Sequence, residues 1–102
     1  MRKAQALDKA RTVLANDAEF DNKALIAAAE RMYGPYSRRM AGRLRTMLSV
    51  VIDRRCRALP ALVVEGFSHR NTGVVLRCAE GIYFLQQVCA ELVAAFELDK
   101  PR

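Results

Sequence analysis

Seven arginines are concentrated in one short part of this sequence. Between positions 37 and 59 they are accompanied by a single acid, Asp53, so this segment has a formal charge of +6, equal to that of the whole chain. A guanidinium group binds phosphate and carboxylate oxygens through paired N–H donors. The segment therefore predicts a surface that attracts polyanions, provided that its arginines face outward together.

Apolar residues recur in this segment at intervals of three and four, which predicts a helix. Its apolar face holds Met40, Leu44, Met47, Leu48, Val51 and Leu59. We expect Pro60 to end the helix, since proline lacks a backbone N–H and clashes with the preceding turn. Along one border of the apolar face lie Arg39, Arg43, Arg54 and Arg57, and along the other lie Arg38 and Arg45.

Arg55 is the exception, because it projects close to the apolar face. A charge is costly there unless it is paired or its head group reaches water. The candidate partners are Glu30, Glu80 and Glu91.

Ser37 is a suitable N-cap for this helix. Arg38 and Arg39 follow in the first turn, where the helix dipole disfavours positive charge, and a bound phosphate would offset that effect. The predicted nucleic-acid-binding residues are Tyr36, Ser37, Arg38, Arg39, Arg43, Arg45, Arg54 and Arg57. The alternative is that these arginines only keep the helix solvated, since the chain uses 13 arginines and four lysines throughout.

Other residue types do not predict catalysis or metal binding. The carboxylates are scattered, and His69 has no evident partner for acid–base work. Cys56 lies between Arg55 and Arg57, whose charges favour a reactive thiolate, but a cysteine on a solvated helix border is the simpler interpretation. Three cysteines without a C-x-x-C pair indicate free thiols and no zinc site. We expect a protein that is not an enzyme, with no catalytic residue, metal or cofactor.

Helix signals position these residues along the rest of the chain. The composition is that of a globular protein, and residues 1–102 are expected to form one all-α domain, a bundle of about four helices. The first helix spans about 2–15, with Leu7, Ala10 and Leu14 on one face. Asn16 and Glu19 have the spacing of a capping box, which predicts a second helix from there to the Gly34-Pro35 stop. For residues 61–73 a strand, a helical turn and a buried linker all remain open.

The last helix, expected from Asn71 or Thr72 to about Glu97, is apolar over an unusually wide arc. Such a helix needs neighbours on several sides. It is therefore expected either at the centre of the bundle or at a dimer interface. The predicted interface residues are Ile82, Leu85, Cys89, Leu92 and Phe96.

Residues 27–44 loosely resemble the helix-turn-helix of bacterial DNA-binding regulators. The likeness consists of an alanine-rich first helix, Gly34 in the turn, and a basic second helix anchored by Met40 and Leu44. The resemblance implies that Ser37, Arg38 and Arg43 contact phosphates or base edges. The turn is longer than in that family, Pro35 is unusual there, and the second helix is about twice the usual length.

Two functions follow as hypotheses. The first is a small DNA-binding regulatory protein, a homodimer through its last helix, with the arginine helix on the nucleic acid. The second is a helical adaptor or inhibitor that binds a regulatory protein partner through the apolar face of its last helix, around Ile82, Leu85, Leu92 and Phe96, with its arginines docking on an acidic patch. The longest apolar run, residues 81–90, is far shorter than the roughly 20 residues of a membrane span. Asp8, Lys9 and Arg11 interrupt the N-terminal residues where a signal peptide would have its apolar core, so a cytoplasmic location is expected.

Overall fold

A computed structural model describes the backbone of residues 2–68 and 72–100, and the side chains of those ranges except 62–68, 72 and 74. It has four helices, α1 (Lys3–Ala15), α2 (Asn22–Tyr33), α3 (Arg38–Ser68) and α4 (Thr72–Phe96). This confirms the predicted all-α fold of four helices. Among the described residues, no helix combines the length and the low charge that crossing a membrane requires.

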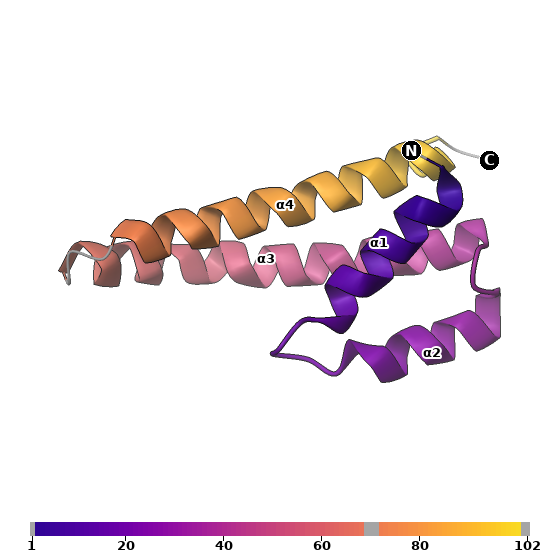
Figure 1. The fold of residues 1–102 in the computed structure, drawn as a ribbon, viewed down its shortest axis with the longest axis horizontal. Helices are drawn as coiled ribbons and strands as arrows, with labels where there is room; N and C mark the ends of the chain where they lie inside the picture. Colours follow the sequence, from indigo (N-terminus) through magenta and orange to yellow (C-terminus); the bar gives the residue numbers. More distant parts are fainter. Residues whose placement is uncertain (1, 69–71, 101–102) are drawn as a thin grey trace.

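The long helices α3 and α4 lie side by side and antiparallel, and together they set the 48 Å length of the molecule (Figure 1). The helices α1 and α2 pack only near the end where α3 begins and α4 finishes. The far half of the α3–α4 pair therefore extends beyond the other two helices.

The core lies where all four helices meet. The predicted apolar face of α3 is confirmed over residues 40–51, because Met40, Leu44, Met47, Leu48 and Val51 are all buried, whereas Leu59 is only half-buried. The predicted face of α1 is confirmed as well, with Leu7, Ala10 and Leu14 fully buried.

The second helix begins later than the sequence predicted. Instead of forming a capping box, Asp17 accepts a hydrogen bond from the backbone N–H of Glu19 at 3.0 Å. The side chain of Asn22, buried at the first position of α2, donates to the backbone carbonyl of Leu14 at 2.9 Å. Because these side chains satisfy backbone groups around the end of α1, residues 16–21 form a connection and α2 starts at Asn22.

The expected end of the third helix at Pro60 is also wrong, since α3 continues to Ser68. A proline inside a helix removes one backbone hydrogen bond and costs about 3 kcal/mol. Here the helix packs along α4 over much of its length, and that tertiary packing outweighs the local cost. Residues 61–68 are therefore helical, while residues 69–71, which include the predicted cap Asn71, lie outside the described ranges.

The predicted interface residues of α4 do not form a free surface. Their side chains face α1 and α3, which cover that side of the helix: Ile82, Leu85, Leu92 and Phe96 are buried, and Cys89 is half-buried against the core. Among the described side chains of α4, the large apolar ones that are exposed are instead Leu76, Tyr83 and Phe84.

Candidate functional site

The two residues predicted just before α3 are engaged within the chain. The hydroxyl oxygen of Ser37 accepts a hydrogen bond from the backbone N–H of Met40 at 3.0 Å, which confirms Ser37 as the N-cap. The ring of Tyr36 lies 4.9 Å from the guanidinium of Arg11, measured from ring centre to carbon. The Ser37 hydroxyl is therefore already used in the fold.

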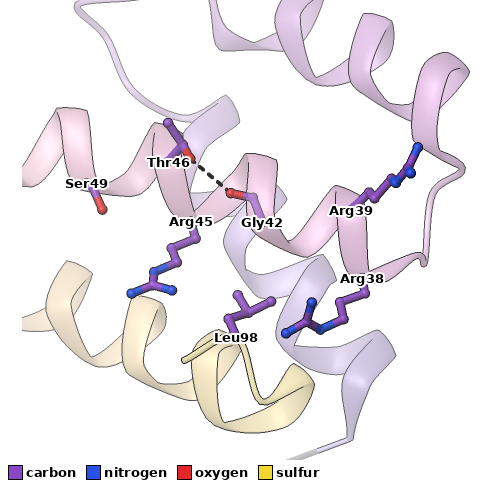
Figure 2. A pocket seen from close by; sticks show the side chains of 7 residues that line it. All are labelled: Arg38, Arg39, Gly42, Arg45, Thr46, Ser49 and Leu98. Atoms are coloured by element: carbon purple, nitrogen blue, oxygen red, sulfur yellow. Dashed lines mark hydrogen bonds between the residues drawn. The ribbon is translucent and has the colours of Figure 1, made fainter. Parts of the chain in front are cut away.

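The side chain of Arg38 caps the C-terminus of α4 (Figure 2). Its guanidinium donates hydrogen bonds to the backbone carbonyls of Phe96 at 3.3 Å, Glu97 at 3.1 Å and Lys100 at 3.2 Å. The last carbonyls of a helix lack partners within it and carry the negative end of its dipole. The positive charge at the start of α3, which the sequence left without a partner, is thus offset by the C-terminus of α4.

Carboxylates of the same chain pair with three further arginines. Arg45 binds Asp99 at 3.0 Å, and Arg57 binds Asp53, one turn before it on α3, at 2.9 Å. Arg54 reaches the connection before α2, where it binds Glu19 at 3.3 Å. Those three charges are compensated internally.

Arg54 also has two other partners in that connection. Its guanidinium carbon lies 3.4 Å from the centre of the Phe20 ring, a stacked arrangement. The carboxylate of Asp17, whose side chain is only 3% exposed, lies 3.8 Å away. Arg54 therefore fixes the α1–α2 connection to α3.

Arg55 extends toward α4, and its terminal nitrogen would lie 4.0 Å from a Cβ at Gly81. Two of its three predicted carboxylate partners bind other groups, since Glu30 pairs with Arg11 and Glu91 with Lys9. Arg55 remains exposed, so its head group has access to water, and it projects from the face of α3 that packs on α4.

The proposition that seven arginines form one outward surface is therefore wrong. Within the described residues, Arg39 and Arg43 are the two arginines of the predicted site that have no ion pair or hydrogen-bond acceptor for their side chains, and both are exposed. The sequence could not show most of this, because the partners of Arg38, Arg45 and Arg54 come from residues 17–20, far before α3, and residues 96–100, far after it. The partner of Arg57, by contrast, is the neighbouring Asp53 on α3.

A hollow of about 500 Å³ lies beside these residues on the outer face of α3 (Figure 2). Guanidinium groups and two hydroxyls supply its polar lining, Gly42 is part of its wall, and Leu98 closes the α4 side. Its lining residues are Arg38, Arg39, Gly42, Arg45, Thr46, Ser49 and Leu98.

A second hollow of about 390 Å³ is lined by Tyr33, Arg39, Gly42, Arg43 and Thr46. The two hollows share three residues and so adjoin at the same place on α3. The lining residues that the sequence did not predict are Tyr33, Gly42, Thr46, Ser49 and Leu98. A glycine inside the predicted helix was the one available signal, because glycine weakens a helix interior.

Among the described residues, no three metal-binding side chains come together. Burial raises the pKa of the Cys89 thiol, and Asp99 raises it further against an opposing effect of Arg45. Cys78 is half-buried, and Cys56 is exposed.

We expect thiol-labelling rates to follow this exposure. Cys56 should react with a small alkylating reagent about as fast as a cysteine in an unstructured peptide, and Cys89 much more slowly, because its thiolate is disfavoured and partly covered. Mass spectrometry of partially labelled protein gives both rates. A Cys56 rate well above that of the peptide would contradict its assignment as an ordinary surface thiol.

No protein-family model, curated protein or solved structure matches this chain, so its site is described from its own geometry alone.

Proposed function

We propose that this chain is a helical adaptor without catalytic activity, which binds and regulates a partner protein. The observation that carries the proposal is a set of large apolar side chains that are about half or more exposed. These are Phe20, Leu25, Met32, Tyr36, Val50, Leu76, Tyr83 and Phe84. These residues are spread over several elements, and exposed apolar side chains mark a binding site for another protein where they gather on one face of a small domain.

The outer face of α4 is the strongest part of that surface. Tyr83 is 63% exposed, and along the same face lie the exposed small residues Ala79, Ala90 and Ala94. Successive members of this set are four, seven and four positions apart, so they lie on one side of the helix. A tyrosine beside small side chains offers an anchor and allows a partner helix to approach closely.

DNA binding is the competing function and remains a prediction. Its support is smaller than the sequence indicated, because most of the arginine charge is compensated inside the chain. Specific duplex binding typically uses about six to ten phosphate contacts. Arg39 and Arg43 alone provide few of these.

Site-specific photo-crosslinking in cells tests the adaptor function. A photoreactive residue in place of Tyr83 should capture one partner protein, and the product should survive nuclease treatment. The matched control places the same residue at Lys23, which is exposed on α2. We expect no equivalent product from the control.

Two results would count against the adaptor function. One is a crosslink from position 83 only to a second copy of the chain, which would indicate a homo-oligomer. The other is absence of any protein product combined with tight retention on duplex DNA that weakens steeply as salt rises.

A further inference from the structure

The smaller of the two adjoining hollows is a shallow groove beside the first turns of α3. We name it the α3 groove and define it by its lining residues Tyr33, Arg39, Gly42, Arg43 and Thr46. The hydroxyl of Thr46 donates a hydrogen bond to the carbonyl of Gly42 at 3.1 Å, which holds that side chain against its own helix (Figure 2). The space above Gly42 therefore stays open between the two free arginines.

Gly42 is not required by the packing of the described residues. A Cβ added there would have no atom within 4 Å, and the backbone is helical without a positive φ. Alanine is the better residue in such a position, and the exchange should raise Tm by about 4 °C. The helix thus carries a destabilising residue whose one visible consequence is the open groove.

Arg39 and Arg43 also lack an anionic partner that would offset the repulsion between them. They stand four residues apart on α3, where like charges face each other and repel. Neither has an ion pair within the described ranges, whereas Arg45, Arg54 and Arg57 all do. An anionic group bound between the two guanidiniums would remove that repulsion.

We infer that the α3 groove binds an acidic segment of the partner protein, with a carboxylate placed between Arg39 and Arg43. The inference rests on the proposed adaptor function and names the chemistry of the partner. The groove is open along one side, so it suits a segment of chain that crosses it better than a small molecule, which needs enclosure. The other paired arginines of α3 already bind groups of the same chain, so the helix does not offer a phosphate backbone a continuous row of free guanidinium groups.

Binding of a fluorescent oligoglutamate peptide to the full chain tests this assignment. We expect the double variant Arg39→Gln/Arg43→Gln to lower the affinity about tenfold, because two exposed charge pairs are lost. The control, Arg31→Gln, removes an exposed arginine from α2 and should leave the affinity within about twofold. Fluorescence anisotropy at low and moderate salt provides the measurement.

Gly42→Leu gives a second test that does not depend on charge. A leucine at this position fills the groove while favouring the helix, so peptide binding should weaken although Tm stays the same or rises. A variant that binds the peptide as well as the original chain would overturn the inference.

Other outcomes separate the inference from the proposed function. If the control weakens binding as much as the double variant, peptide binding reflects net charge and the groove is not a site. If duplex DNA binds more tightly than the peptide and depends on Arg39 and Arg43, the ligand is nucleic acid. If the partner captured at position 83 is unaffected by the double variant, the adaptor function stands and the groove assignment fails.

Discussion

Leu92→Ala should lower the free energy of unfolding by about 3 kcal/mol and Tm by about 15 °C. Leu92 is 0% exposed and lies within the core, where α4 packs against α1 and α3. Truncation removes buried apolar surface and leaves a cavity that a close-packed helical core cannot fill fully. Thermal and urea denaturation of the purified chain measure the effect.

The control for this prediction is Tyr83→Ala on the outer face of the same helix. Because Tyr83 contributes an exposed side chain, its loss should change the unfolding free energy by about 0.5 kcal/mol or less. A different result would support the dimer interface that the sequence predicted for Leu92. In that case Leu92→Ala would leave the unfolding free energy nearly unchanged and alter the molar mass in solution.

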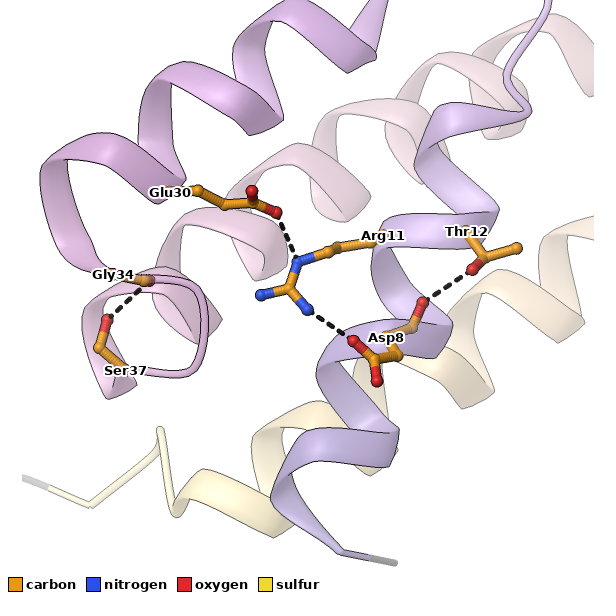
Figure 3. Close-up of polar contacts among 6 residues, drawn as sticks. All are labelled: Asp8, Arg11, Thr12, Glu30, Gly34 and Ser37. Carbon is orange, nitrogen blue, oxygen red and sulfur yellow. Dashed lines mark hydrogen bonds and ion pairs between the residues drawn. The ribbon is translucent and has the colours of Figure 1, made fainter.

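Arg11→Met should destabilise the chain by about 2 kcal/mol, although arginine is usually a surface residue. The Arg11 side chain is only 15% exposed and lies between α1 and α2 (Figure 3). It binds Asp8 at 2.7 Å and Glu30 at 2.8 Å, and its guanidinium also faces the ring of Tyr36. Methionine keeps much of the apolar stem and removes the charge, so the expected loss comes from the unpaired carboxylates.

A double variant identifies that cause. Glu30→Gln removes the half-buried carboxylate that Arg11→Met leaves without a partner, so the double variant should regain part of the lost stability. Arg31→Met, on the exposed side of α2, should have little effect. Equal losses from Arg11→Met and Arg31→Met would show that the ion pair between Arg11 and Glu30 does not hold α1 to α2.

Arg11 also illustrates what a single-sequence analysis overlooks. The sequence drew attention to the arginines of α3 because they cluster, and passed over Arg11 because it stands alone among mixed charges. An isolated charge contributes strongly to stability only when it is buried, and its burial depends on neighbours from other helices. Arg54 is a related case, because its border position on α3 was predicted but its stacking on Phe20 was not.

Local physics accounts for what the sequence determined by itself. The intervals of apolar residues fixed the helical class and the buried faces of α1 and α3, and the hydroxyl of Ser37 fixed the start of α3. Each of these features depends on residues within a few positions of one another, where helix geometry alone sets their relative placement.

Tertiary structure alone decided the rest, because the deciding partners are distant in the chain. Packing against α4 keeps α3 helical beyond Pro60. The backbone carbonyls at the end of α4 accept hydrogen bonds from Arg38 and so offset its charge. The same packing buries the apolar stripe around Leu92 and leaves Tyr83 in solvent. Charge and hydropathy determine which residues need a partner, but only the arrangement of the helices determines which of them find one.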